Sequence, residues 1–215
     1  MKKIIVLAVA MLLAGKILAE DAATAPADAA AKYTATLEGR AADILKELAL
    51  TNAAAASRVH DLVVAQYRAL NAWHNANDAK LKSARGDTNA VAEIRASLKV
   101  LHDAFLSGLV ENLTPALVEQ VKDKMTYGKV RFTLAGYLAQ YPDLSATHQA
   151  EILRLLKQAR EDAMDAGSAA EKTAIFQKYK GRINNYLSQQ GIHPQKTKTI
   201  APAAASPAPA DQPPK

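Results

Sequence analysis

The side chains best suited to hold a ligand in this sequence are aromatic residues that occur together with amide and guanidinium groups. Aromatic rings pack against the apolar C–H faces of sugars, while amides and guanidinium groups bond to sugar hydroxyls. The candidate ligand-binding residues with these properties are Trp73, Tyr127, Tyr137, Tyr179, Arg182, Asn185 and Tyr186. Tyrosine and tryptophan are also common at the margins of helical cores, so each residue has a purely structural alternative.

Signatures of catalysis and metal binding do not occur. The five histidines are scattered without an HExxH pattern, and the absence of cysteine excludes thiol chemistry. Glu161, Asp162 and Asp165 are neighbours on one predicted helix, whereas glycoside hydrolysis needs two carboxyl groups across a cleft. We interpret these three as a solvated patch. The sequence predicts a non-enzymatic protein with no catalytic residues, no cofactor and no metal site; a glycan-active enzyme is the minority alternative.

Gly181 is one of the glycines that stand inside a predicted helix. A glycine costs about 1 kcal/mol relative to alanine at such a position, so a reason for it is expected. Close contact with a neighbouring helix and close approach of a ligand are the two explanations that the sequence leaves open.

The elements that must position these residues are helices. Between residues 33 and 193 the apolar side chains recur every three or four positions, as in Val91, Ile94, Leu98, Leu101 and Phe105, and no strand-like alternation occurs. We predict an all-α fold: an irregular bundle of six to seven amphipathic helices in a single domain over residues 35–193. The predicted helices are 35–49, 52–84, 88–111, 115–126, 130–140, 146–166 and 169–190.

Side chains that can cap helices mark where these helices begin. Thr51, Thr114 and Ser145 each follow a leucine and precede an apolar helical run, and Pro115 suits a first helical position. Ser168 and Glu171 have the spacing of a capping box, just after a glycine that ends the preceding helix.

The two ends of the chain have a different composition. Residues 1–19 combine Lys2 and Lys3 with a short apolar run and end in alanine, which predicts a cleavable signal peptide rather than a membrane anchor. Residues 20–34 are an Ala/Pro-rich linker and 194–215 a Pro/Ala-rich tail, both expected to be disordered. The protein is therefore expected in the periplasm or outside the cell, with no stable membrane span after cleavage.

The net charge argues against nucleic acid as a partner. The formal charge is +6, but loss of Lys2, Lys3 and Lys16 with the signal peptide leaves 24 basic against 21 acidic residues, or +3. A nucleic-acid-binding face needs clustered lysine and arginine with a strong net charge, and no such cluster is present.

Four segments carry a resemblance to a known family. Residues 125–128 (MTYG), 135–138 (AGYL), 159–168 (AREDAMDAGS) and 178–187 (KYKGRINNYL) resemble a bacterial secreted family of unknown function that carries a provisional sugar-binding label. The likeness extends from about residue 37 to 193. It implies an oligosaccharide or cell-wall glycan as the partner.

A second resemblance supports the alternative function. The Leu-Thr and Leu-Ser helix starts are similar to the LTxxQ motif of periplasmic helical chaperones and stress adaptors, although the glutamines here come late, at Gln120 and Gln149. This similarity implies a periplasmic helical chaperone or structural scaffold that works through a helical surface.

Overall fold

The computed structural model describes residues 28–195, and these contain seven helices and no strand. The all-α fold is therefore confirmed. The described chain divides into two units, residues 28–40 and residues 41–195. The predicted signal peptide over 1–19, most of the 20–34 linker and all but two residues of the 194–215 tail lie outside the described residues.

The first unit is helical throughout its described length. The described residues are helical from residue 28 onward, whereas the predicted helix begins at residue 35, so residues 28–34 of the predicted linker are helical. Alanine, the strongest helix former, occupies positions 29 to 31, and composition alone had suggested a linker there. The Thr36 hydroxyl donates to the Lys32 carbonyl, 2.9 Å away, within the same helix.

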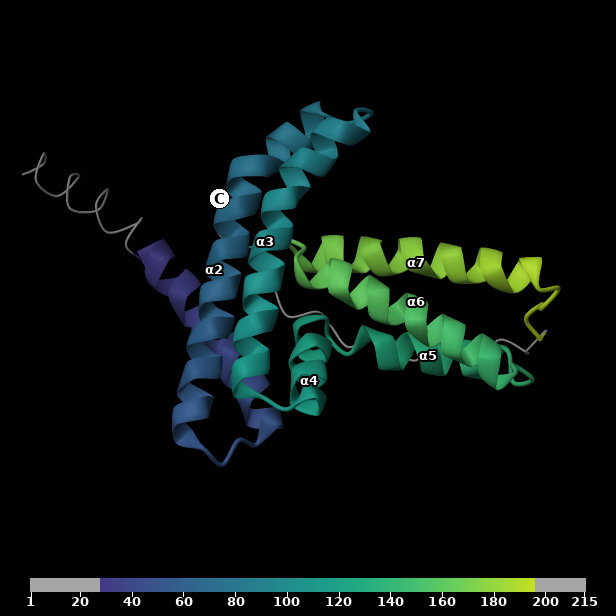
Figure 1. Cartoon of the computed structure of the whole chain (residues 1–215), viewed down its shortest axis with the longest axis horizontal. Coiled ribbons are helices and arrows are strands. Elements are labelled where there is room, and N and C mark those ends of the chain that lie inside the picture. The colour runs from purple at the N-terminus through teal and green to yellow at the C-terminus, as the bar shows by residue number, and fades with distance from the viewer. Residues whose placement is uncertain (1–27, 196–215) are drawn as a thin grey trace, which may run out of the picture. The chain divides into compact units, whose positions relative to one another are not determined.

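The second unit opens with helical residues 41–48 and continues with six labelled helices (Figure 1). Their limits differ from the predicted ones by no more than two residues at each end. They are α2 (Ala53–Ser83), α3 (Thr88–Asn112), α4 (Pro115–Met125), α5 (Lys129–Gln140), α6 (Ala146–Met164) and α7 (Ala169–Gln189).

Capping side chains begin most of these helices. Thr114 and Ser145 cap α4 and α6 as predicted. The cap of α2 is Asn52, whose side chain accepts from the Ala55 amide, so the prediction of Thr51 is wrong by one residue. Asparagine accepts the first-turn amide bond as well as threonine does, and the sequence offers both side by side.

The capping box of α7 differs in one detail from the usual pattern. Ser168 accepts from the Glu171 amide at 3.2 Å, as expected. The Glu171 carboxylate accepts from the amide of Gly167 at 2.8 Å, one residue before the cap. The carboxylate thereby ties the α6–α7 connection to the first turn of α7.

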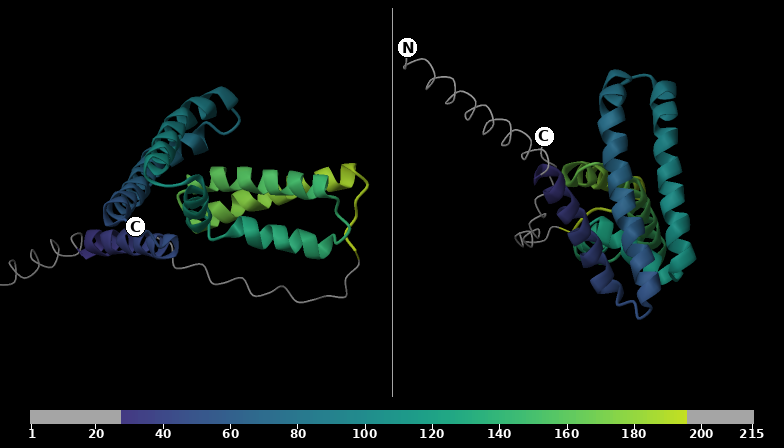
Figure 2. Two further views of the ribbon diagram at one scale, coloured as in Figure 1. Left: turned by 60° about the horizontal axis from the view of Figure 1, so that its bottom comes forward. Right: turned by 90° about the vertical axis from the view of Figure 1, so that its left-hand side faces the viewer.

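Packing within the second unit follows two groups of helices. Helices α2 and α3 pack along each other, as the right-hand view of Figure 2 shows, while α6 packs along α7 and against α5 (Figure 1). Helix α4 contacts both α3 and α6. The α2–α3 packing is close, because a Cβ atom at Gly108 would lie 2.7 Å from Cδ2 of Leu62.

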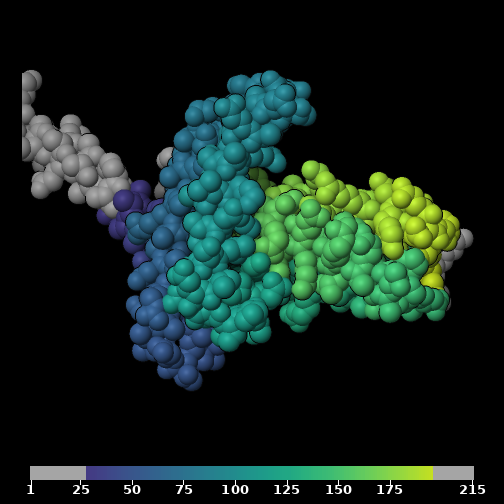
Figure 3. Space-filling model, viewed as in Figure 1, coloured from purple at the N-terminus to yellow at the C-terminus, as the bar shows by residue number. Residues whose placement is uncertain are grey.

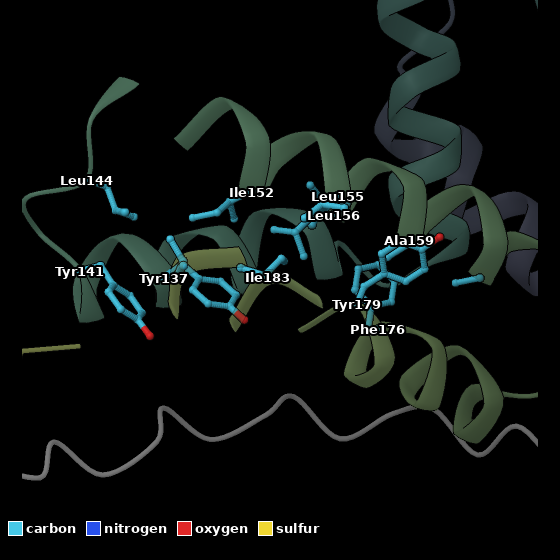
Figure 4. Close-up of a cluster of buried hydrophobic side chains, with 13 residues drawn as sticks. Tyr137, Tyr141, Leu144, Ile152, Leu155, Leu156, Ala159, Phe176, Tyr179 and Ile183 are labelled. Carbon is cyan, nitrogen blue, oxygen red and sulfur yellow. The ribbon is translucent and has the colours of Figure 1, made fainter. Parts of the chain in front are cut away.

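A cluster of buried apolar side chains lies between α5, α6 and α7 (Figure 4). Ile152, Leu156 and Ile183 are fully buried there, together with the rings of Tyr179 and Phe176. Residues 176, 179, 183 and 187 form the core-facing stripe of α7.

A buried cation joins α4 to α6. The Arg160 guanidinium, 3% exposed, donates from Nη1 to Asp123 at 2.6 Å and from Nη2 to both Glu119 oxygens at 2.8 Å. Burial raises the pKa of Glu119, but the bonds from Arg160 and Lys157 outweigh it and hold that pKa below its usual value.

Across the described helices, none is long and apolar enough to cross a membrane.

Candidate functional site

A pocket of about 590 Å³ lies in the second unit where α2, α3, α6 and α7 meet. We call it the Trp73 pocket. In Figure 3 the hollow is where the teal surface of α3 meets the green surface of α6 and α7. Its lining residues are Trp73, His74, Leu81, Arg95, Leu98, Lys99, His102, Glu161, Asp162, Asp165, Ala166, Ala174, Ile175 and Lys178.

Helical spacing brings the α3 side of the pocket together. Arg95, Leu98, Lys99 and His102 stand at positions i, i+3, i+4 and i+7, so they share one face of α3. This face mixes cationic and apolar side chains.

Trp73 forms an aromatic wall that is fixed in place. Its ring is 7% exposed, and Nε1 donates to the Ser97 hydroxyl on α3 at 2.8 Å. The Ser97 hydroxyl donates in turn to the Ile94 carbonyl at 2.9 Å. Because its polar tip is bound, the indole offers the pocket an apolar surface.

His74 is clamped between two acceptors. Its Nε2 lies 2.7 Å from the Asp165 carbonyl oxygen and its Nδ1 lies 2.9 Å from Asp78 Oδ1. Both contacts are satisfied together only when both ring nitrogens carry protons. Burial lowers the pKa of His74, but the bonds to Asp165 and Asp78 outweigh it and raise that pKa above the usual value.

His102 and Asp165 form a partly buried ion pair. His102 Nδ1 lies 2.9 Å from Asp165 Oδ2, and the two side chains are 15% and 14% exposed. This contact raises the pKa of His102. The pair is not aligned as a hydrogen bond, since His102 Nδ1 and Asp165 Oδ1 are buried without a hydrogen-bond partner. A histidine held in its protonated form is a poor general base near neutral pH, so this pair favours electrostatic stabilisation over catalysis.

The carboxylates of the pocket are all engaged by the protein. Glu161 lies 3.0 Å from Lys122 Nζ and 3.8 Å from His102 Nε2. Asp162 accepts from the Tyr179 hydroxyl at 2.8 Å. Asp162 is exposed, as the interpretation as a solvated patch predicts, whereas Glu161 and Asp165 are partly buried, and α3, α4 and α7 supply each carboxylate with a partner.

The cations of the pocket are less engaged. Arg95 on α3 and Lys178 on α7 are exposed, and neither has a hydrogen bond or ion pair with another residue in the described chain. Lys99 pairs only with Asp103, one turn further along the same exposed helix face, at 2.5 Å. The charged side chains of the pocket that have no partner among the described residues are thus both positive.

Of the seven residues predicted from the sequence, Trp73 is the one that lines the pocket. Tyr137, Tyr179 and Tyr186 use their hydroxyls within the α5–α6–α7 group. Tyr137 donates to Asn184 at 2.8 Å, and the Tyr186 hydroxyl lies 2.8 Å from His148 Nδ1. Burial raises the pKa of Tyr137 to about 12. Figure 4 shows the rings of Tyr137 and Tyr179 within the apolar cluster.

The remaining predicted residues occupy other places. Tyr127 lies in the α4–α5 turn at φ 59°, with its ring 5.5 Å from the buried Lys172 ammonium. The Arg182 guanidinium stacks over the Tyr179 ring at 4.4 Å, and Asn185 is exposed further along α7. Gly181 is exposed and an added Cβ would meet nothing within 4 Å, so close helix packing does not explain this glycine.

The sequence did not indicate His74, Arg95, His102 or Lys178 as ligand-binding residues, and it indicated Asp165 only as part of a solvated patch. One local signal existed, namely the shared face of Arg95 and His102 on α3. The other partners come from helices distant in sequence.

Comparison with known proteins places the chain in a family. A family model described as a protein of unknown function, DUF3826, matches residues 34–200, and the chain belongs to this family. No curated protein matches the sequence. Within residues 28–195, no group of three or more histidine, aspartate or glutamate side chains could hold a metal ion.

Proposed function

We propose that this protein binds an oligosaccharide, or part of a cell-wall glycan, in the Trp73 pocket without transforming it. The proposal includes export to the periplasm or the cell exterior after loss of residues 1–19. The observation that carries it is the pairing of a rigid indole wall with polar side chains that have no protein partner. Such a combination is typical of small-molecule sites, where an apolar surface supplies affinity and a few polar groups fix orientation.

The pocket supports this function better than the residues first chosen from the sequence. The hydroxyls of Tyr137, Tyr179 and Tyr186 already have protein partners, and displacing them would break partly buried hydrogen bonds. Buried polar groups left without a partner cost roughly 1–3 kcal/mol each. Arg95 and Lys178 carry no such penalty.

Intrinsic fluorescence tests the proposal directly, because Trp73 is the only tryptophan in the chain. The purified protein is titrated with a panel of plant and bacterial cell-wall oligosaccharides while tryptophan emission is recorded. We expect one glycan class to change the emission saturably. At one hundred times its dissociation constant the ligand should add about 2.7 kcal/mol to stability, a shift of very roughly 5–10 °C in the unfolding midpoint.

Matched variants locate the site. Arg95→Met changes the pocket, whereas Arg182→Met changes a cation that stacks on Tyr179 outside it. Binding that weakens only with Arg95→Met supports the Trp73 pocket. Binding that weakens only with Arg182→Met would move the site to the aromatic residues of α7, and no response to any glycan would contradict the proposal.

A helical chaperone or structural scaffold is the alternative function, and the described surface offers it less support. Exposed large apolar side chains among residues 28–195 are Val100, Val110 and Phe132, on two different helices. A chaperone surface would be expected to show a contiguous apolar patch. Suppression of client aggregation without any glycan response would favour this alternative.

A further inference from the structure

We propose that the Trp73 pocket selects an acidic sugar, whose negatively charged group pairs with Arg95 and Lys178. This inference rests on the proposed function and names its ligand class. The carboxylates that line the pocket have partners within the protein, whereas two of its cations do not.

Each carboxylate of the pocket has a partner within the protein. Asp165 faces His102 at 2.9 Å, Glu161 faces Lys122 at 3.0 Å, and Asp162 accepts from the Tyr179 hydroxyl. A cationic ligand would have to compete with these contacts. Desolvating a carboxylate and removing its partner costs several kcal/mol, so a cationic ligand is disfavoured.

The positive charges are available. Arg95 and Lys178 have no ion pair within residues 28–195, and the partner of Lys99 is an exposed aspartate on its own helix. Each can therefore approach an anion without first giving up a buried contact. Hydrogen bonds between a cationic donor and a carboxylate or sulfate are roughly twice as strong as neutral ones.

The two pocket histidines face carboxylates of their own. His74 and His102 are both held towards their protonated forms by the acceptors around them. His74, His102 and Lys99 face Asp78, Asp165 and Asp103, which leaves Arg95 and Lys178 as the cations of the lining that no carboxylate offsets. The excess favours an anion.

The position of Trp73 restricts the anion to one with an apolar body. Trp73 shares the apolar part of the lining with Leu81, Leu98 and Ile175, a surface that a sugar ring can cover and a bare inorganic anion cannot. An acidic sugar presents both features in one residue: C–H groups for Trp73 and a charged substituent for Arg95 and Lys178.

The test compares ligands that differ only in charge. Tryptophan fluorescence of the purified protein is titrated with an oligogalacturonide, with its fully methyl-esterified form, with a sulfated oligosaccharide, and with inorganic phosphate and sulfate. We expect the charged oligosaccharide to bind at least about tenfold more tightly than the ester, and added salt to weaken it. Preference for the sulfated ligand over the oligogalacturonide would identify the charged group as a sulfate ester.

Variants assign the effect to the pocket cations. Arg95→Gln and Lys178→Gln should each weaken binding of the acidic ligand about tenfold and leave binding of a neutral one unchanged. Arg182→Gln removes a cation from the same helix as Lys178 but outside the pocket, and should change neither.

The outcomes separate this inference from the proposed function. Equal binding of the acid and its ester, with no effect of Arg95→Gln, would overturn the acidic-sugar inference and leave glycan binding intact. Phosphate or sulfate ions that bind as tightly as the oligosaccharide would also overturn it, since the sugar body would then contribute nothing. Absence of binding by every glycan in the wider panel would overturn both.

Discussion

At the scale of single residues, the hydroxyl groups of the buried tyrosines on α5 and α7 form hydrogen bonds with other residues of the protein. The Tyr137 hydroxyl lies 3.1 Å from the Lys180 carbonyl and 2.8 Å from the Asn184 side chain. The neighbouring Tyr141 ring is stacked 6.1 Å away, and its hydroxyl makes no hydrogen bond among the described residues. These two tyrosines therefore differ in what their hydroxyls contribute.

Removing the Tyr137 hydroxyl should be costly while removing that of Tyr141 should not. We expect Tyr137→Phe to lower the free energy of unfolding by about 1 kcal/mol, because one hydrogen bond is lost and its acceptors are left to water. Tyr141→Phe, which keeps the stacked rings, should change it by less than about 0.5 kcal/mol. Urea unfolding measures both. Equal losses would show that the Tyr137 hydroxyl contacts add nothing to stability.

Arg160 is the second residue whose role is set by its partners. Arg160→Met keeps an unbranched side chain but removes the charge that faces Glu119 and Asp123. Breaking a fully buried ion pair costs roughly 3–5 kcal/mol, and because the two carboxylates are 40% and 43% exposed we expect a smaller loss.

Arg154→Met on the same helix is the control. Arg154 pairs only with Glu151 one turn away on an exposed surface, at 2.7 Å, where such pairs contribute about 0.2–1 kcal/mol. Denaturant midpoints that shift equally for the two variants would contradict the role of Arg160 as the link between α4 and α6.

At the scale of elements, helix limits follow from local rules. The effect on stability of replacing a helical glycine, in contrast, depends on how closely a neighbouring helix packs against it. Gly181 and Gly108 both lie inside long helices. A methyl group at Gly181 would enter open space, while one at Gly108 would lie 2.7 Å from Leu62 Cδ2.

These two glycines should respond differently to the same substitution. We expect Gly181→Ala to raise stability by roughly 0.5–1 kcal/mol, because alanine loses less backbone entropy in a helix. Gly108→Ala gains the same term but must displace Leu62, so its midpoint of thermal unfolding should lie below that of Gly181→Ala. A lower midpoint for Gly181→Ala than for the unchanged protein would show that this face of α7 is not open.

At the scale of the whole second unit, the histidines that join the helices around the Trp73 pocket link stability to pH. The pKa values of His74 and His102 are raised above 6.5 in the folded protein. Their contribution is therefore complete below pH 6.5 and is lost as the pH rises through the raised values. The lowered pKa of Glu119 acts in the opposite sense: its contribution is present above pH 4.5 and is lost as the pH falls further.

We accordingly expect the unfolding midpoint to be highest in mildly acidic buffer and to fall between pH 6 and pH 8. His102→Gln should flatten this decline, whereas His193→Gln, at an exposed position, should leave it unchanged. The measurement is thermal unfolding across buffers of constant ionic strength. A midpoint that stays level or rises towards pH 8 would contradict the assignment of His74 and His102 as charged links.

Much of the fold could be predicted from sequence because helix formation is governed by local interactions. Apolar spacing predicted every labelled helix of the second unit, and the caps at Asp87, Thr114, Ser145 and Ser168 act on amides two or three residues away. Two features were not predicted. Thr51 and Asn52 can both cap a helix, and the cap is Asn52; residues 28–34 are helical, although their composition also fits a linker.

The candidate site could not be predicted in this way, apart from Trp73. Residues 73–81, 95–102 and 161–178 become neighbours only through packing, and His74 meets the Asp165 carbonyl across 91 positions of sequence. Whether a polar group is free to bind a ligand depends on such long-range contacts. The sequence predicted Tyr179 as a ligand-binding residue, but in the structure its hydroxyl donates a hydrogen bond to Asp162. The sequence by itself determined the helices and the family, because both are encoded in local pattern. Tertiary structure decided which charges face the pocket without partners, since electrostatic pairing depends on distance in space.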